Sequence, residues 1–116
     1  MKYVLLIYDD PQALAGMDDA ARGEMYEEYG KYYTGLEERG IIRGGQQLAP
    51  PTSATMVTTE SGATLTTDGP YAETKEQLGG FFLIECDTLD EAVEAAAQIP
   101  SAKHGGKIEV RPILEM

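Results

Sequence analysis

Residues 68–77 combine side chains capable of acid–base chemistry with a turn sequence. They read Asp-Gly-Pro-Tyr-Ala-Glu-Thr-Lys-Glu-Gln and connect two stretches of strand character. Loops between rigid elements are common places for sites. At a strand end beside a pocket that partly excludes water, a carboxylate can act as a general base, and we predict this role for Asp68. The alternative is that Asp68 only stabilises the turn, by accepting hydrogen bonds from nearby backbone N–H groups.

The same segment offers further polar side chains for a bound molecule. Tyr71 or Lys75 is predicted to donate a hydrogen bond to the substrate in the acid–base step. Glu73 and Gln77 are predicted ligand contacts, Gln77 through its side-chain amide. The alternative for Glu73 and Lys75 is solvated surface, where an ion pair contributes at most about 1 kcal/mol.

Two candidate ligand contacts lie far from this segment in the sequence. Tyr8 ends the first predicted strand, at the sheet edge where residues 68–77 should emerge, and a ring with a polar tip suits a pocket wall. Arg111 lies in the last predicted strand and could bind a carboxylate, or form an ion pair with one of the 20 acidic residues. Four tyrosines of the first helix are interpreted as packing residues rather than ligand contacts: Tyr26, Tyr29, Tyr32 and Tyr33.

The sequence gives little support to a metal or cofactor site. His104 and Cys86 are the only residues of their types, and one histidine with one distant cysteine does not make the usual zinc site. The paired acids at residues 9–10 and 18–19 lack the alternating spacing of a calcium loop. No Ser-His-Asp or Cys-His arrangement can be proposed. We therefore predict no metal and no cofactor.

Hydrophobic patterning predicts the elements that position these residues. Residues 2–8 are a continuous apolar run, typical of a central strand buried on both faces. Residues 18–39 are predicted as a helix, with Asp18 as its N-cap and Gly40 ending it. The helix places one stripe toward the core, formed by Met25, Tyr29, Tyr32, Tyr33 and Leu36.

The second half of the chain repeats this order after a hairpin. Thr88 and Glu91 form a capping box, and Pro100 stops the helix that follows. The Glu60-Ser61-Gly62 turn joins two threonine-rich strands. Strands are predicted at residues 41–48, 54–59, 63–67, 79–86 and 106–114. The order is that of a single α+β domain spanning residues 1–116, a ferredoxin-like split β-α-β sandwich with an inserted β-hairpin.

Composition limits the classes of partner. The net charge is -11, from 20 acids against 9 bases, so nucleic acid and anionic membranes are not expected to bind. The single cysteine excludes an intrachain disulfide and favours the cytoplasm. The first apolar run is too short to span a bilayer and has no signal-peptide cleavage pattern.

Four segments together resemble the YCII-related family, in the branch often called DGPF-domain proteins. They are residues 1–8, Gly44-Gly45-Gln46-Gln47-Leu48, the Asp68-Gly69-Pro70 signature with Tyr71 where the family has phenylalanine, and Glu109-Val110-Arg111-Pro112. The resemblance implies a dimeric α/β-barrel with a pocket between sheet and helices in each protomer. The apolar runs of the central strands independently favour a homodimer, because the sheet face opposite the helices needs a cover.

The resemblance implies no settled activity. Related YCII proteins carry a histidine and an aspartate proposed as a catalytic pair, but the early strand of this chain lacks the histidine. We therefore predict a cytoplasmic homodimer that binds a small polar or aromatic molecule, with cofactor-free acid–base catalysis by Asp68. The rival hypothesis is a non-catalytic regulatory or interaction module linked to extracytoplasmic-function sigma factors, which presents the acidic face of the first helix. The sequence leaves open whether the protein is an enzyme.

Overall fold

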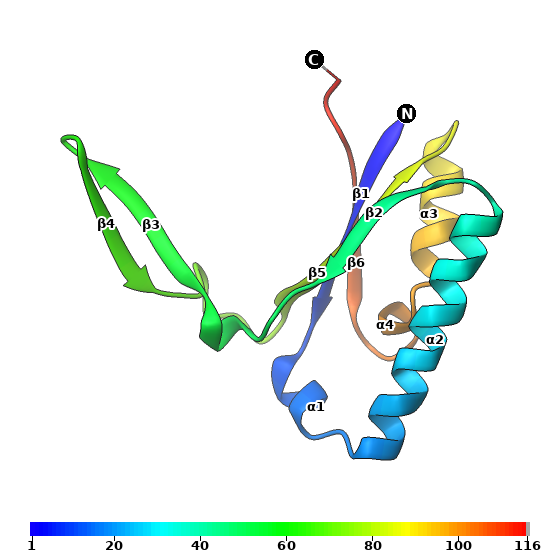
Figure 1. Cartoon of the computed structure of the whole chain (residues 1–116), viewed down its shortest axis with the longest axis horizontal. Helices are drawn as coiled ribbons and strands as arrows, with labels where there is room; N and C mark the ends of the chain where they lie inside the picture. The colour runs from blue at the N-terminus through cyan, green and yellow to red at the C-terminus, as the bar shows by residue number, and fades with distance from the viewer. Residues whose placement is uncertain (116) are drawn as a thin grey trace.

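A four-stranded antiparallel sheet forms the centre of the protein in a computed structural model, which describes residues 1–115 (Figure 1). Its strands lie in the order β2-β5-β1-β6. Strand β5 lies between β1 and β2, and β1 lies between β5 and β6, so the strands of each half are split by a strand of the other half. Their bounds are β1 Lys2–Asp9, β2 Ile42–Gln47, β5 Gln77–Glu85 and β6 Lys107–Pro112.

Two helices cover one face of this sheet, α2 (Asp19–Glu38) and α3 (Leu89–Ala97). The core lies between them and the sheet, where Leu5, Ile84, Leu36 and Ile99 are fully buried. Burying one such aliphatic side chain stabilises the fold by roughly 1.5–3 kcal/mol. The predicted α+β fold is therefore confirmed.

Three of the predicted helix-end residues are confirmed, whereas Pro100, predicted to stop the second helix, begins the short helix α4 after α3 has ended at Ala97. The Asp18 side chain accepts a hydrogen bond from the backbone N–H of Ala21 at 2.7 Å. The Thr88 hydroxyl accepts one from the N–H of Glu91 at 3.2 Å. Gly40 follows α2 with a φ of 70°, a left-handed conformation that glycine adopts without steric cost.

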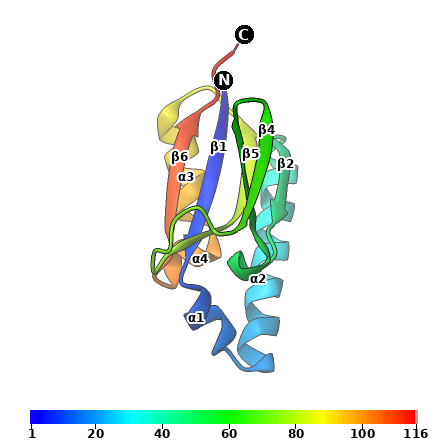
Figure 2. The same ribbon diagram turned by 90° about the vertical axis from the view of Figure 1, so that its left-hand side faces the viewer.

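The inserted hairpin stands apart from the main sheet. It consists of β3 (Thr55–Glu60) and β4 (Ala63–Asp68), which pair only with each other. Ser61 and Gly62 connect them with φ values of 48° and 82°, as in the type I′ turns that suit two-residue hairpins. The hairpin projects from the body on the side opposite the helices and, in the side view, overlies the strands of the sheet (Figures 1 and 2). We call residues 55–68 the arm.

Three short elements were not predicted: α1 (Pro11–Ala15), the 3₁₀ turn η1 (Pro51–Ser53) and α4 (Pro100–Lys103). Asp10 caps α1, because its carboxylate accepts a hydrogen bond from the N–H of Gln12 at 3.0 Å. The prediction that residues 2–8 are buried on both faces is wrong for the single chain. Tyr3, Leu5 and Ile7 are buried under the helices, whereas the alternate residues of β1 stay partly exposed on what we call the open face.

Candidate functional site

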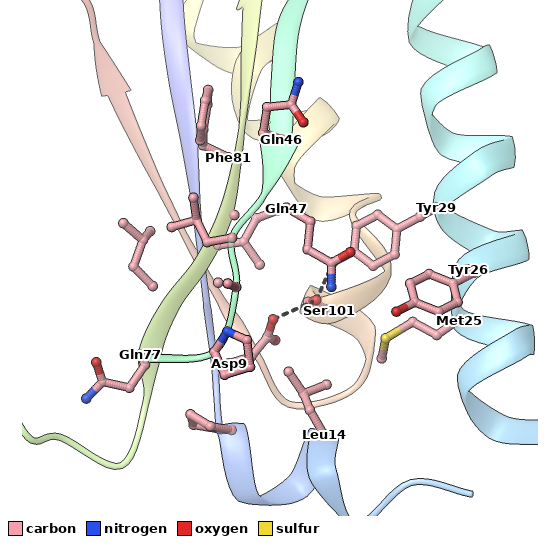
Figure 3. A pocket seen from close by; sticks show the side chains of 18 of the residues that line it. Asp9, Leu14, Met25, Tyr26, Tyr29, Gln46, Gln47, Gln77, Phe81 and Ser101 are labelled. Atoms are coloured by element: carbon pink, nitrogen blue, oxygen red, sulfur yellow. Dashed lines mark hydrogen bonds between the residues drawn. The ribbon is translucent and has the colours of Figure 1, made fainter. Parts of the chain in front are cut away.

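A cavity of about 730 Å³ lies on the helix side of the sheet, between the ends of the central strands and helices α1 and α2. Pockets for small organic molecules usually enclose roughly 300–1,000 Å³. Its walls are mainly apolar and aromatic, with Leu14, Met25, Tyr26, Tyr33 and Phe82 among the lining residues. Figure 3 shows most of this lining. The cavity is suited to an apolar or aromatic molecule.

Asp9 places a carboxylate in the wall of this cavity. Side chains alternate between the faces of a strand, so Asp9 continues the row of Tyr3, Leu5 and Ile7 on the helix face. Burial raises the pKa of the Asp9 carboxyl above its ordinary value, a hydrogen bond from Ser101 opposes this, and the charge of Glu76 adds to it. A carboxylate with a raised pKa is a stronger base than an ordinary aspartate, and such groups gather at functional sites.

Two hydroxyl groups connect the Asp9 carboxylate to helix α2. The Ser101 hydroxyl, whose residue is only 2% exposed, donates to Asp9 Oδ2 at 3.3 Å. The Tyr29 hydroxyl is hydrogen-bonded to the same Ser101 oxygen. Because Ser101 has a single proton, and gives it to Asp9, its oxygen accepts from Tyr29. Figure 3 shows Asp9 and Ser101 pointing toward each other across the base of the cavity.

Glycines allow the backbone to approach the carboxylate closely. A Cβ atom on Gly106 would lie 2.6 Å from Asp9 Oδ1 and 2.8 Å from the carbonyl oxygen of Ser101. A Cβ atom on Gly79 would lie 3.5 Å from Asp9 Oδ2. Any side chain at residue 106 would therefore displace Asp9 or Ser101.

The remaining polar groups of the lining indicate which charge a ligand would carry. Arg22 is the one basic residue among the lining residues, and its guanidinium group donates to the carbonyl oxygens of Leu14 at 3.0 Å and Met17 at 3.5 Å. Of the three glutamines in the lining, Gln47 lies on the helix face of β2, whereas Gln46 lies opposite Phe81 on the other face and the Gln77 amide donates to backbone carbonyl oxygens of the 72–77 loop. A carboxylate beside a neutral amide favours a neutral or positively charged ligand over an anion.

Three of the predicted site residues line a second, shallower hollow of about 570 Å³ at the base of the arm: Tyr8, Tyr71 and Gln77. Tyr8 lies on the opposite sheet face from Asp9, and Tyr71 is 87% exposed. The Gln77 amide donates to the carbonyl oxygens of Ala72 at 2.8 Å and Thr74 at 2.9 Å. Its observed contacts therefore hold the 72–77 loop together.

The other predicted site residues line neither cavity. Asp68, Glu73 and Lys75 are exposed, and within residues 1–115 the Asp68 carboxylate receives no hydrogen bond. Arg111 is exposed and forms an ion pair with Glu109. The structure thus brings Tyr8, Tyr71 and Gln77 together at the second hollow. The other four predicted site residues lie outside both cavities.

The turn around Asp68 has a visible structural role through its glycine. The Gly69 N–H donates to the carbonyl oxygen of Ala54 at 2.8 Å. A Cβ atom on Gly69 would lie 2.9 Å from the Cβ of Ala54. This close approach joins the two ends of the arm at its base.

The carboxylate and both hydroxyl groups of the larger cavity are not among the predicted site residues. Asp9 enters the predictions only as half of an Asp-Asp pair, Tyr29 as a packing residue, and Ser101 not at all. The alternation of Tyr3, Leu5 and Ile7 is a signal that places Asp9 on the core face. Residues 29 and 101 meet only through the tertiary fold, so no local pattern identifies them.

Within residues 1–115, no group of three His, Cys, Asp or Glu side chains is arranged to hold a metal, and no helix is long and apolar enough to cross a membrane.

Two comparisons with known proteins show what this chain is similar to. The family model of the YCII-related domain matches residues 1–116. The uncharacterized protein R00369 of Rhizobium meliloti (strain 1021) is 34% identical over 114 residues, which cover 97% of this chain and 92% of that protein. The likeness thus extends over nearly the full length of both chains.

Proposed function

This chain belongs to the YCII-related domain family, and we propose that it binds a small aromatic molecule in the cavity beside Asp9 and performs cofactor-free acid–base chemistry on it. The observation that supports this proposal is the Asp9 carboxylate, held in an aromatic cavity by a hydrogen bond from the buried Ser101. This role replaces the one predicted for Asp68, which lies on the surface.

The ligand that fits this wall is neutral or positively charged and carries an O–H or N–H group. Its ring would lie among the tyrosines of α2, and its donor would reach Asp9. An anionic ligand would meet the carboxylate and a chain of net charge -11, so repulsion disfavours it.

Asp9 would remove a proton from the bound molecule and return it to another atom of the same molecule. Because its pKa is raised above the ordinary value, the Asp9 carboxylate is a stronger base than an exposed aspartate, which favours removal of the proton. The Ser101 hydroxyl, polarised by Tyr29, donates to the ionised carboxylate before the first step and after the second, and Asp9 carries the proton between the two steps. No electron leaves or enters the ligand, so this chemistry needs no oxidant or reductant.

The acting unit in this proposal is a cytoplasmic homodimer. Four side chains of the open face support dimerisation, because Val4, Leu6, Phe81 and Leu83 are apolar and partly exposed in the single chain. The single cysteine, Cys86, is free and buried, as is usual for a protein of a reducing compartment.

Binding of 2-naphthol, followed by fluorescence, tests the proposal against 2-naphthoate as the anionic counterpart. We expect 2-naphthol to bind and 2-naphthoate to bind at least about tenfold more weakly. Asp9→Asn should weaken 2-naphthol binding by about tenfold, the usual effect of losing a hydrogen bond to a charged group. Asp68→Asn is the control and should bind normally. Equal binding by both variants and wild type would overturn the role of Asp9.

The alternative function is a non-catalytic interaction module, linked to sigma-factor signalling. Its supporting observation is the exposed acidic surface of α2, which includes Glu24, Glu27, Glu37 and Glu38. Binding of a basic partner to this surface would weaken steeply with salt. Loss of partner binding in Glu24→Gln/Glu27→Gln, with 2-naphthol binding unchanged, would favour this alternative.

A further inference from the structure

The Glu76 carboxylate lines the hollow at the base of the arm. This hollow of about 570 Å³ lies where η1, the end of β1 and residues 70–78 meet (Figure 1). Within the described part of the chain, Glu76 is the only charged residue of its lining. The Oε1 atom of Glu76 forms an ion pair with Lys107. Its Oε2 atom is the only buried side-chain oxygen or nitrogen of residues 1–115 that makes no hydrogen bond.

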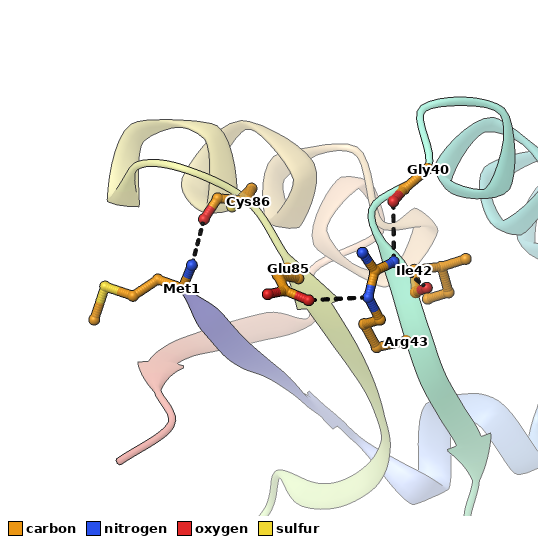
Figure 4. A network of polar contacts seen from close by, with 6 residues as sticks. All are labelled: Met1, Gly40, Ile42, Arg43, Glu85 and Cys86. Carbon is orange, nitrogen blue, oxygen red and sulfur yellow. Dashed lines mark hydrogen bonds and ion pairs between the residues drawn. The ribbon is translucent and has the colours of Figure 1, made fainter. Parts of the chain in front are cut away.

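An ion pair at the other end of β5 shows the contrast. Arg43 pairs with Glu85 at 3.1 Å, and their side chains are 44% and 42% exposed, so that water reaches the carboxylate (Figure 4). The Glu76 side chain is 31% exposed as a whole, but its Oε2 atom is shielded from solvent. A shielded acceptor without a donor destabilises the free protein, most of all when it carries charge. A ligand that donates a hydrogen bond to Glu76 Oε2 would remove this penalty.

The walls of the hollow are mainly apolar and aromatic. They include three prolines and two tyrosines: Pro50, Pro51, Pro70, Tyr8 and Tyr71. The face of a tyrosine ring attracts a cation, and proline rings present an apolar surface. Among the lining residues that the structure describes there is no lysine or arginine. This lining favours an organic cation with an apolar body.

The charges around Glu76 also favour a cation. Burial is the main reason that the pKa of Asp9 is raised, and the charge of Glu76 adds to it, so the two carboxylates lie close enough to repel each other. Lys107, which pairs with Glu76, is 72% exposed, and the chain as a whole carries a net charge of -11. This field attracts cations and repels anions. A metal ion is disfavoured, because hard cations take several oxygen ligands and Glu76 alone supplies a carboxylate among the described lining residues.

Hydrogen bonds hold the wall around Glu76 in place before a ligand binds. The Gln77 amide donates to the carbonyl oxygens of Ala72 at 2.8 Å and Thr74 at 2.9 Å. The Thr74 hydroxyl donates to the carbonyl oxygen of Glu76 at 2.5 Å. These bonds fix the backbone that carries the carboxylate. A site that is formed in advance loses less conformational entropy on binding.

We propose that this hollow is a binding site for a small primary amine, whose ammonium group donates to Glu76 Oε2 and whose apolar chain lies against the prolines and tyrosines. A primary ammonium group has three N–H donors, whereas a quaternary ammonium group has none and would leave the oxygen without a partner. The volume of the hollow lies within the roughly 300–1,000 Å³ of small-molecule pockets. The inference goes beyond the function proposed for Asp9 and does not depend on it. The two sites lie on opposite faces of the sheet, although both contact residues 48–51 and 77–78.

Titration of the ¹⁵N-labelled chain with hexylamine gives the first test. We expect saturable shifts of the amide signals of Ser53, Tyr71 and Ala72, which line this hollow and not the Asp9 cavity. Hexyltrimethylammonium has the same chain and charge but no donor, and it should bind at least about tenfold more weakly, the usual effect of losing a hydrogen bond to a charged group. Equal affinities for the two cations would overturn the inference.

The position of the shifts distinguishes the hollow from the Asp9 cavity. Gly30 and Tyr33 line the cavity and not the hollow. Hexylamine shifts confined to Gly30 and Tyr33, or absent from the whole chain, would overturn the inference. Binding of 2-naphthol reports separately on the Asp9 cavity, so that either proposal can fail alone.

Two substitutions in the same segment give the second test. Glu76→Gln keeps the shape of the side chain and removes its charge, and it should raise the dissociation constant of hexylamine at least about tenfold. Glu73→Gln is the matched control. Glu73 is exposed and lines neither cavity, so in about 0.15 M salt its loss should change the constant by no more than about twofold. Equal losses in the two variants would indicate general attraction to an acidic chain and would overturn the inference.

Discussion

Substitutions at Gly30 can test the stability of helix α2 and its contact with a ligand separately. It lies in the middle of the helix and lines the cavity beside Asp9. Tyr26, Gly30 and Tyr33 follow each other at helical spacing on one face, and all three line the cavity. A Cβ atom at residue 30 would meet no heavy atom within 4 Å, so the fold does not require glycine here. We infer that glycine keeps space free for a ligand.

Replacing Gly30 should therefore affect stability and binding in opposite directions. Gly30→Ala should raise the free energy of unfolding by roughly 0.5–1 kcal/mol, because glycine is that much less favourable than alanine within a helix. Gly30→Leu adds a larger side chain that projects into the cavity, and it should weaken 2-naphthol binding at least tenfold, or about 1.4 kcal/mol.

Gly23 provides the matched control on the same helix. A Cβ atom there also meets nothing within 4 Å, but Gly23 is not among the residues that line the cavity. Urea unfolding should show a similar gain for Gly23→Ala and Gly30→Ala, and fluorescence titration should show weaker binding only for Gly30→Leu and not for Gly23→Leu. Unchanged binding by Gly30→Leu, or equal losses in both leucine variants, would refute the position of the ligand beside α2.

The titration of Asp9 predicts a pH-dependent stability. Its folded-state pKa is raised above the ordinary value of 3.8, so its contribution to stability is fully present below that value and is lost as pH rises through the folded-state pKa. Asp9→Asn should equal wild type in free energy of unfolding near pH 3 and exceed it at pH 7. The difference between the two proteins should grow by at most about 1.4 kcal/mol per pH unit. A constant difference in urea unfolding across this pH range would contradict this prediction. Ser101→Ala leaves Asp9 and the Tyr29 hydroxyl without their shared partner and should cost about 1–3 kcal/mol, whereas Thr52→Ala, at an exposed position, should stay within about 0.5 kcal/mol of wild type. Gly69→Ala should cost about 1–3 kcal/mol, because its Cβ would lie 2.9 Å from the Cβ of Ala54. Asp68→Asn should change stability by less than about 0.5 kcal/mol, and a larger loss by calorimetry would restore Asp68 as a turn-stabilising residue.

Local sequence signals predicted the main elements of the fold. Asp18, Gly40 and Thr88 each act within three residues of a helix end, so the chemistry that ends a helix can be read from the sequence. The short helix α1 was missed although Asp10-Pro11 is a common N-cap and first-turn pair. The orientation of the arm relative to the main sheet could not be predicted, because the turn sequence determines only how β3 and β4 pair with each other.

The candidate site was harder to predict because its groups meet only in the folded chain. The 68–77 segment has many ionisable side chains, but a solvated loop gives a carboxylate little protection from water, and its most constrained residue is Gly69. The Asp9 carboxylate has one charged neighbour in the sequence, and its environment comes from residues 29, 79, 101 and 106. Density of polar residues in the sequence was therefore a poorer guide than the face on which a single residue lies.

The alternating side chains of strand β1 contribute to both the proposed ligand site and the proposed dimer interface. Its odd residues, Tyr3, Leu5 and Ile7, pack under the helices and lead to Asp9 in the cavity. Its even residues, Val4 and Leu6, lie on the open face and lead to Tyr8 at the base of the arm. A shift of one residue in the pairing of β1 would exchange these two rows. It would move the Asp9 carboxylate out of the cavity and onto the open face. The proposed ligand site and the proposed dimer interface therefore both depend on the register of this strand.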